Sequence, residues 1–435
     1  MSRKKKEETG GTAGKAVPSV VMRALLEDRP TVKGVYLGKD IDLRLVGVRS
    51  PGFALSWCMD STVLPLGHVV GIAGPSQSQK TSLALEFSRV GMGYGGYCCL
   101  IDNEGAKYSP SLIRSVLNVE NDSDRVVLLR SDSLEECQRR MTEVVRVFHD
   151  KKLLSELWTL ILDSMSGTET EGEMTKIDEE GSAGRAHPVG ALSWTRYMRW
   201  LTSRINPFPV LVVAINHLKE KPPHPGQMFG GKSTPGGVAQ RFHAMTYFWV
   251  KRLWMSGDSE SRSTWDFPRV EDGKIVPGSE HLPMEVRKIE ITCEKNSQGA
   301  DNRSIRVDFC FYTDLSGKKR AFFDWDGSLA NLLSDTQDSL GLIAEDGKNR
   351  YGRLKEVLEI SRSRNRYTCP QLDLTGVSPQ VMGFAVQHAP ELLSKLVRFF
   401  GINESPEWTG KMPDPPSPSF LDFEPPPGAQ ESIDL

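Results

Sequence analysis

The sequence lacks any hydrophobic run that approaches the roughly 18 apolar residues of a membrane span. Its seven cysteines are scattered, with no CxxC pair and no Cys/His cluster at zinc-ligand spacing, which excludes a small disulfide-stapled scaffold. The N-terminus has basic residues but no apolar stretch behind them, so we expect a reduced, cytoplasmic protein without membrane contact. The formal charge of −2 provides no general attraction to nucleic acid, and any such contact must come from local loops.

Changes in composition along the 435 residues indicate five parts. Residues 1–16 are rich in Lys, Glu and Gly with almost nothing to bury, which predicts a flexible basic arm, and a small module follows at 17–50. We expect the core at 51–320 and a small helical module, interrupted by a Cys-Pro step, at 321–403. Residues 404–435 are acidic and Pro-rich, which predicts a disordered tail.

Short apolar runs alternate with helical patterns through the expected core. Each run is too short for a helix and rich enough in Val, Ile and Leu for a buried strand. The predicted strands are Val69–Ala73, Tyr97–Ile101, Val126–Leu129, Leu160–Leu162 and Val210–Ile215, and the predicted helices include Thr81–Val90, Pro110–Leu117, Leu134–His149 and Ser193–Ile205. The alternation predicts an α/β fold with a mostly parallel central sheet and crossover helices. Two longer β-type segments, Val286–Glu294 and Ile305–Tyr312, are expected as antiparallel additions to one edge.

A candidate phosphate-binding loop follows the first predicted strand. It runs Gly74-Pro75-Ser76-Gln77-Ser78-Gln79-Lys80-Thr81 and continues through Ser82 into a helical pattern. In such a loop backbone N–H groups surround the phosphates, the lysine reaches the β- and γ-phosphates, and the threonine hydroxyl binds Mg²⁺. Gln79 stands where glycine is usual, so its side chain must point away from the ligand. A surface loop with an accidental Lys-Thr pair is the alternative that this string leaves open.

Two acidic residues follow predicted strands of the same sheet. Asp163 comes after Leu160–Leu162, and Glu104 comes shortly after Tyr97–Ile101. Ligand groups gather at the carboxyl ends of strands in an open parallel sheet, so Asp163 is placed to hold the Mg²⁺ shell and Glu104 to orient or deprotonate water. Either acid alone could cap a helix or lie in a loop. Together with the phosphate loop they predict a site that binds a nucleotide with Mg²⁺ and hydrolyses it; ATP as the nucleotide is implied only by the resemblance described next.

The order of these motifs resembles the RecA-family recombinases, most closely the RecA-like strand-exchange proteins of tailed phages, from about Ser50 to Tyr312. Residues 64–75 are similar to the family's approach to the phosphate loop, 101–104 to its catalytic-glutamate strand and 162–164 to its magnesium strand. The resemblance implies a RecA-like P-loop NTPase core, a DNA-dependent ATPase activity and a homo-oligomeric helical filament. It also implies that the module at 17–50 serves oligomerisation.

The segment after the strand Val210–Ile215 resembles the family's second DNA-binding loop. The resemblance places His217 at the polar position that senses the γ-phosphate and relays the nucleotide state. The expected DNA contacts in this loop are Lys219, Lys221, Met228, Phe229, Lys232, Gly236 and Gly237. The first DNA loop is expected within 181–190, where Arg185 and His187 are the available contacts. A mobile surface loop is the alternative for the second segment, and exposed filler is the alternative for the first.

In the RecA family ATP lies between adjacent subunits, and cations from the neighbour complete its site. The segment Ile289–Lys295 resembles the strand that carries these cations, so Lys295 is expected to contact the nucleotide. Ser297 stands at the second cation position, so either one charge suffices here or Arg303 substitutes for the missing one. Leu112 stands near the position of the aromatic residue that stacks on adenine in the family.

These observations predict an ATP-dependent recombinase that forms filaments on single-stranded DNA and pairs it with homologous double-stranded DNA. Its expected catalytic residues are Lys80, Glu104 and His217, and its expected partners include a single-strand-binding protein and a loader protein. A RecA-fold helicase is one alternative, although it would not need the Gly-rich segment after His217. A filament-forming ATP-binding scaffold with little hydrolysis is the other, suggested by Gln79 and the incomplete neighbour cations.

Overall fold

A computed structural model provides the fold of the chain. It describes residues 45–103, 110–118, 124–166, 170–180, 189–217, 219–220, 232–233, 239–253, 260–262, 268–271, 274–276, 284–334, 360–363 and 366–410. These residues belong to one unit that spans Arg44–Met412. Within them, no helix is both long and apolar enough to cross a lipid bilayer.

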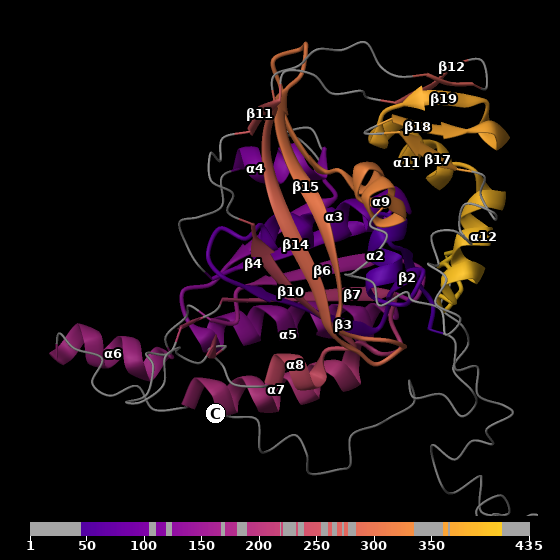
Figure 1. Ribbon diagram of the computed structural model, residues 1–435. Helices are drawn as coiled ribbons and strands as arrows, with labels where there is room; N and C mark the ends of the chain where they lie inside the picture. Colours follow the sequence, from indigo (N-terminus) through magenta and orange to yellow (C-terminus); the bar gives the residue numbers. More distant parts are fainter. Residues whose placement is uncertain are drawn as a thin grey trace, which may run out of the picture. The chain divides into compact units, whose positions relative to one another are not determined.

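A mixed ten-stranded sheet organises the described part of the chain, in the order β16-β15-β14-β10-β3-β7-β6-β4-β5 with β11 beside β14 (Figure 1). The parallel strands are β10 (Thr246–Arg252), β3 (His68–Gly74), β7 (Val210–His217), β6 (Trp158–Asp163), β4 (Tyr97–Asp102) and β5 (Val126–Arg130). The antiparallel strands are β14 (Met284–Asn296), β15 (Arg303–Thr313), β16 (Lys319–Phe323) and β11 (Glu260–Arg262). The central strands β3, β6 and β7 are buried along almost their whole length, because both faces of the sheet are covered.

Helices cover the two faces of the sheet. Figure 1 shows α5 (Leu134–Lys151), α7 (Val189–Ile205) and α8 (Ala239–His243) on one side, and α2 (Phe53–Cys58), α3 (Lys80–Gly93) and α9 (Trp325–Ser334) on the other. The remaining helices of the core are α4 (Pro110–Leu117) and α6 (Glu171–Glu180). In α5 the Ser133 hydroxyl caps the N-terminus by accepting from Glu136 N, and the buried apolar residues recur every three or four positions.

The predicted α/β fold with a mostly parallel sheet is confirmed. Each of the five predicted strands and four predicted helices lies inside an observed element of the same type. The two β-type segments form β14 and β15, which pair antiparallel at one edge as expected. The sequence prediction did not include β10, which lies between β3 and β14 and joins the parallel and antiparallel parts of the sheet.

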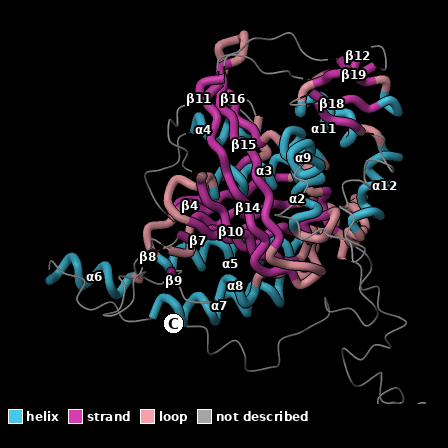
Figure 2. Tube along the Cα trace, viewed as in Figure 1, coloured by secondary structure: helices cyan, strands magenta, loops and turns pink. Residues whose placement is uncertain are grey.

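The expected helical module after residue 321 is wrong in part. Its described residues contain a three-stranded antiparallel sheet of β17 (Ser361–Ser363), β18 (Arg366–Cys369) and β19 (Leu374–Val377), before the helices α11 (Pro379–Gln387) and α12 (Pro390–Phe400) (Figure 2). The Cys-Pro step ends β18, because Pro370 begins a 3-10 turn, Pro370–Leu372. The helices pack on the core, where Phe53 and Phe400 have ring centroids 5.9 Å apart.

The last described segment also packs on the core, beyond the expected start of the tail at residue 404. Strand β1 (Gly47–Arg49) pairs with β2 (Val63–Pro65) on one side and bridges Glu407 on the other. Trp408 N donates to Gly47 O at 2.8 Å, and the Trp408 side chain is buried. The tail boundary predicted at Glu404 is therefore too early. The basic arm, most of the module predicted at 17–50 and residues 411–435 lie outside the described residues.

Candidate functional site

The loop between β3 and α3 has a compact backbone that faces a cavity. Gly74 ends β3, and a Cβ there would overlap the carbonyl oxygen of Val250 on β10, so the close approach of the two strands requires glycine. Ser78 Oγ and Lys80 Nζ donate to the carbonyl of Pro75, at 2.9 and 2.6 Å, which closes the loop on itself. Lys80 is only 4% exposed and begins α3, so its ammonium and the helix N-terminus both favour an anion here.

Gln79 adopts the backbone conformation that glycine usually supplies in such a loop. Its φ of 67° and ψ of 28° are left-handed, which costs a non-glycine residue about 1 kcal/mol. Its Oε1 accepts a hydrogen bond of 3.0 Å from Ser82 Oγ, in the first turn of α3. The side chain is thus tied to the helix, and this contact explains how glutamine is accommodated at the position.

Thr81 and Asp163 form a pair suited to a magnesium ion. Strand β6 ends at Asp163, and the Thr81 hydroxyl at the start of α3 donates to Asp163 Oδ2 at 2.5 Å. Because the hydroxyl donates this hydrogen bond to the carboxylate, the lone pairs of its oxygen stay available to a cation. Mg²⁺ takes few protein ligands and completes its shell with water and phosphate oxygens, so these two side chains fit the ion.

Two hydrogen bonds between the Asn103 side-chain amide and the Ser164 backbone join the end of β4 to the end of β6. The two strands are neighbours, with Asp102 opposite Asp163. Asn103 Nδ2 donates to Ser164 O, and Asn103 Oδ1 accepts from Ser164 N, both at 2.5 Å. Glu104 follows Asn103 directly but lies outside the described residues, so its role as the catalytic carboxylate stays a prediction.

His217 ends β7 beside the phosphate loop. Its Cα is the register partner of Gly74, the last residue of β3. The His217 N–H donates to Ser166 Oγ at 2.8 Å, which fixes the end of the strand against the segment that follows β6. Three neighbouring strand ends therefore bring His217, Asp163 and the phosphate loop to one edge of the sheet, as the sequence predicted for a parallel sheet.

These residues enclose a cavity of about 460 Å³. Its predicted members are Ser76, Gln77, Ser78, Gln79, Lys80, Thr81, Ser82, Leu112, Asp163 and His217. Gly74 and Pro75 lead into the same loop. Leu112 comes from α4 and adds an apolar wall, so the cavity has a polar end at the loop and an apolar end at the helix.

Two further lining residues were missed from the sequence, Arg287 on β14 and Phe311 on β15. The guanidinium carbon of Arg287 lies 4.6 Å from the centre of the Phe311 ring. Phe311 places an aromatic ring in the cavity, although the sequence prediction found only Leu112 near the position of the expected aromatic. No local motif marks either residue, and only the pairing of the long strands β14 and β15 brings them to the cavity.

Lys295 and Arg303, the candidate neighbour cations, do not line this cavity in their own chain. Lys295 Nζ donates to the carbonyls of Arg241, Phe242 and Ala244, at 3.0, 2.7 and 2.7 Å, and so caps the C-terminus of α8. Burial and the charge of Arg241 lower the pKa of Lys295.

Arg303 is committed to contacts within its own chain. It donates to Trp57 O at 2.8 Å and to Asp60 Oδ1 at 3.2 Å, with its guanidinium over the Trp57 ring. Moving Arg303 into a neighbouring nucleotide site would leave Asp60 without this partner. Arg303 thus has a structural role within its own chain, and its substitution for the cation missing at Ser297 stays a prediction.

Most of the predicted DNA contacts fall outside the described residues, namely Arg185, His187, Lys221, Met228, Phe229, Gly236 and Gly237. The backbone of the other two is described. Lys219 lies in β8 (Lys219–Glu220) and Lys232 in β9 (Lys232–Ser233), and these short strands pair antiparallel. The segment after His217 is thus closed at its base by a strand pair. Beyond it, Gln240 Nε2 on α8 donates to Ala214 O, which ties α8 to β7.

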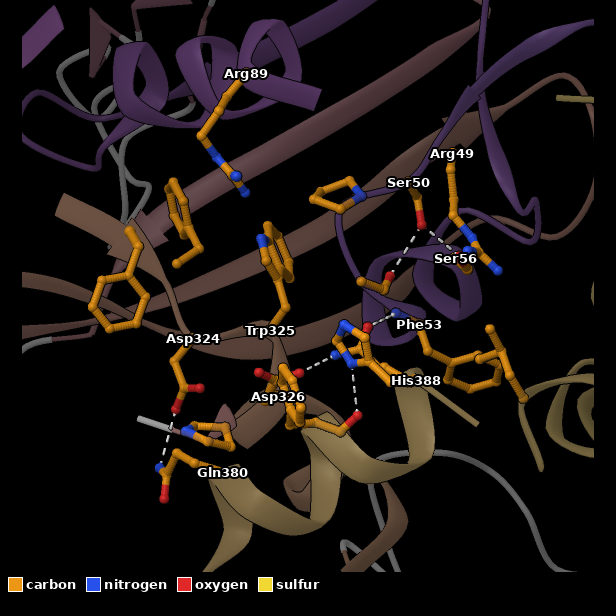
Figure 3. Close-up of a pocket in the computed structure, with 18 of the residues that line it drawn as sticks. Arg49, Ser50, Phe53, Ser56, Arg89, Asp324, Trp325, Asp326, Gln380 and His388 are labelled. Carbon is orange, nitrogen blue, oxygen red and sulfur yellow. Dashed lines mark hydrogen bonds between the residues drawn. The ribbon is translucent and has the colours of Figure 1, made fainter. Parts of the chain in front are cut away.

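A larger cavity of about 1030 Å³ lies elsewhere, between α2, α9 and α11 (Figure 3). Gln380 on α11 donates to Asp324 Oδ2 at 3.2 Å, and Gln387 joins Asp326 to the Phe53 N–H at the start of α2. Burial raises the pKa of Asp324 to about 7 and that of Asp326 to about 6. These amide–carboxyl contacts fasten α11 to the core, and we assign this cavity a structural role.

A strand, an anion-binding loop with a buried lysine, and a Thr–Asp pair at the carboxyl edge of a parallel sheet define a P-loop nucleotide-binding protein. A family profile of the RecA N-terminal domain matches residues 31–266, more than half of the chain, and the chain belongs to the RecA family.

Individual relatives agree at low identity. The chain is 31% identical over 224 residues to DNA repair protein recA homolog 3, mitochondrial, of Arabidopsis thaliana, covering 50% of this chain and 48% of that protein. It is 24% identical over 330 residues to Protein RecA of Bacillus pumilus, covering 73% of this chain and 87% of that protein. It is 29% identical over 258 residues to Protein RecA of Rhodopirellula baltica, covering 55% of this chain and 64% of that protein. The chain thus spans about half the length of the Arabidopsis relative. Closeness to the phage branch stays a prediction.

Proposed function

We propose that this protein is an ATP-dependent recombinase that assembles on single-stranded DNA and exchanges strands with a homologous duplex. The observation that carries the proposal is the single cavity shared by Lys80, the Thr81–Asp163 pair and His217. The family membership and relatives named for RecA or for DNA repair support it.

In this proposal the cavity binds ATP with Mg²⁺. Lys80 and the backbone of the loop hold the β- and γ-phosphates, and Thr81 and Asp163 hold the metal ion. Bound Mg²⁺ supplies neutralisation of the charge that develops on the phosphates. Leu112 and Phe311 make the other end of the cavity apolar, as a base requires. Glu104, predicted beside the γ-phosphate, accepts the proton of the attacking water.

His217 links nucleotide to DNA in this proposal. It lines the cavity and directly precedes the segment that contains the predicted DNA contacts. A hydrogen bond from His217 to the γ-phosphate or its water would therefore alter the position at which that segment begins. Backbone contacts suffice for strand exchange, because base pairing between the strands reads the sequence. The filament, the neighbour's Lys295, a single-strand-binding protein and a loader protein belong to the same proposal.

A filament-forming scaffold with little hydrolysis is the second candidate. It is favoured by one observation, the use of Lys295 within its own subunit as a cap for α8. The rate of ATP hydrolysis with and without single-stranded DNA separates the two. A recombinase hydrolyses ATP faster with DNA, whereas a scaffold shows no such stimulation.

Strand exchange between a circular single strand and a linear duplex tests the proposal directly. The wild-type protein should form joint molecules in the presence of ATP, and Lys80→Ala should form none because the phosphates lose the lysine of the loop. Glu104→Gln should keep nucleotide and DNA binding while hydrolysis slows by about 10²-fold or more, since the amide cannot accept a proton. Normal ATP turnover by Lys80→Ala would refute the assignment of the phosphate loop.

A further inference from the structure

The apolar end of the nucleotide cavity carries a cation that the phosphate-loop motif does not account for. Arg287 and Glu285 lie on the same face of β14, and Glu285 is the register partner of Phe311 on β15. Arg287 Nε and Nη2 both donate to Glu285 Oε1, at 3.0 and 2.8 Å, and the guanidinium carbon lies 4.6 Å from the Phe311 ring centre. Glu285 and Phe311 therefore fix the guanidinium from two sides.

The Arg287 side chain is partly shielded, with 28% of its surface exposed, whereas Glu285 is 58% exposed. An arginine held in this way loses little further rotamer freedom when a ligand arrives, because its plane is already oriented. A planar guanidinium over an aromatic ring presents its outer face as a flat surface. Such a surface suits a second flat group, since guanidinium planes stack on aromatic rings and on bases.

The position of Arg287 within the cavity favours the base over the phosphates. The phosphate loop, Thr81 and Asp163 occupy the polar end, whereas Arg287 accompanies Leu112 and Phe311. A second cavity of about 570 Å³ shares these three residues with the first. Space therefore continues past Arg287, away from the loop, as a ligand with a bulky group beyond its phosphates requires.

On the basis of the proposed ATP site, we propose that the guanidinium of Arg287 forms one wall of the base pocket, stacked between Phe311 and the purine of the bound nucleotide. Arg287 then contacts the ring face of the base and not its edge. It should therefore strengthen the binding of adenine and guanine nucleotides equally. The contact comes from the same subunit as the phosphate loop. It therefore strengthens nucleotide binding before any neighbour is present.

The alternative is that Arg287 acts as a charge on the phosphates. The two roles differ in what lysine can replace, because lysine keeps the charge and loses the plane. They also differ in the ligand affected. Inorganic tripolyphosphate has the phosphate chain without a base, so only a phosphate contact would alter its binding.

The test uses the full-length protein, with ADP binding measured by calorimetry in the presence of Mg²⁺ and tripolyphosphate measured as a competitor of ADP. Arg287→Ala and Arg287→Lys should each weaken ADP and GDP binding by on the order of fivefold, the equivalent of about 1 kcal/mol. Both variants should leave the inhibition constant of tripolyphosphate unchanged. Arg306→Ala is the matched control, because Arg306 lies on β15, is 74% exposed and does not line the cavity.

Two results would overturn the inference. Unchanged ADP affinity in both Arg287 variants removes Arg287 from the site, and a parallel loss for ADP and tripolyphosphate in Arg287→Ala, rescued by lysine, assigns it to the phosphates. Lys80→Ala separates this outcome from failure of the proposed function itself. If Lys80→Ala binds ADP and tripolyphosphate as the wild type does, the cavity is not the nucleotide site, whatever the Arg287 variants show.

Discussion

The Thr81 hydroxyl donates a hydrogen bond of 2.5 Å to Asp163 Oδ2, which connects the phosphate loop to the end of β6. The two residues are far apart in the sequence, and the parallel order of β3, β7 and β6 brings them together. The direction of this hydrogen bond matters, because a threonine that donates to a carboxylate keeps its oxygen lone pairs for a cation.

Thr81→Val should therefore remove most of the dependence of the protein on Mg²⁺. Valine keeps the shape but has no oxygen, so hydrolysis should fall by about 10²-fold, and Mg²⁺ should no longer strengthen nucleotide binding. Nucleotide affinity measured with Mg²⁺ and with EDTA checks this. Thr81→Ser keeps the hydroxyl and is the control. An undiminished Mg²⁺ effect in the valine variant would show that the ion is held elsewhere.

Gln79 allows the backbone cost of the loop to be measured. Gln79→Gly and Gln79→Ala both remove the contact with Ser82, but only glycine relieves the left-handed backbone. The glycine variant should therefore have a free energy of unfolding about 1 kcal/mol higher than the alanine variant, and nucleotide affinity at least equal to the wild type. Urea unfolding of the pair checks this, and equal stabilities would mean that the loop relaxes when the side chain is shortened.

His217→Ala should uncouple DNA binding from the nucleotide. The side chain lines the cavity but does not belong to the phosphate loop, so ATP affinity should stay close to the wild-type value. The strengthening of DNA binding by ATP should be lost, a coupling of typically about 1–3 kcal/mol. DNA titrations with and without a slowly hydrolysed ATP analogue measure it. His217→Gln keeps a hydrogen-bonding group and should retain part of the effect; an intact ATP effect in His217→Ala excludes the relay.

Asp324 should make stability depend on pH. Burial raises its pKa from 3.8 to about 7 in the folded chain, so between these values the folded state keeps a proton that the unfolded state has released. The free energy of unfolding then falls as the pH rises from about 4 to 7, by at most about 1.4 kcal/mol per pH unit. Asp324→Asn stays neutral and can still accept from Gly327 N.

The asparagine variant should be less sensitive to pH than the wild type between pH 5 and 8 and at least as stable at pH 8. Urea unfolding at several pH values measures the difference, with the exposed Asp301→Asn as a control. Asp326, whose pKa burial raises to about 6, contributes in the same direction over a narrower pH range and remains in both proteins. Parallel pH curves for wild type and Asp324→Asn would mean that water reaches the carboxyl.

The C-terminal segment should divide into a structural and a dispensable part at Gly410. Truncation after Asn403 removes the buried Trp408 and the Glu407 contacts with Arg49 and Tyr94 and should lower the free energy of unfolding by about 3 kcal/mol. Truncation after Gly410 should leave it unchanged. If the acidic residues beyond Gly410 compete with DNA, that shorter truncation also strengthens DNA binding at low salt, and the gain shrinks as screening increases. Superimposable DNA titrations across a salt series leave only a solubilising or partner-binding role.

The strands at the centre of the sheet could be predicted because burial on both faces makes them continuous apolar runs, as in β3 and β7. The site residues that directly follow such strands, Asp163 and His217, could be placed for the same reason. Strand β10 was not included in the sequence prediction. Only its four residues from Thr246 to Trp249 pair with β3, whereas the whole strand pairs with β14.

Long-range pairing hides the remaining features from the sequence. Arg287 and Phe311 reach the cavity only through the pairing of β14 with β15, and no local pattern specifies which residues of two long strands face a distant loop. The partners of Arg303 within its own chain, Trp57 and Asp60, come from a distant helix and turn, so no local pattern indicates them. The β17–β19 sheet was mistaken for helix because its strands are only three or four residues long.

The bridge between Gly47 and Glu407 brings the beginning and the end of the described chain side by side. A short linker could therefore join them without disturbing the sheet, and new ends could be opened at the exposed residues 315–318 that precede β16. We therefore expect the described part of the chain to tolerate circular permutation. Such a permutation would leave the strands that build the nucleotide cavity in the same order within the sheet.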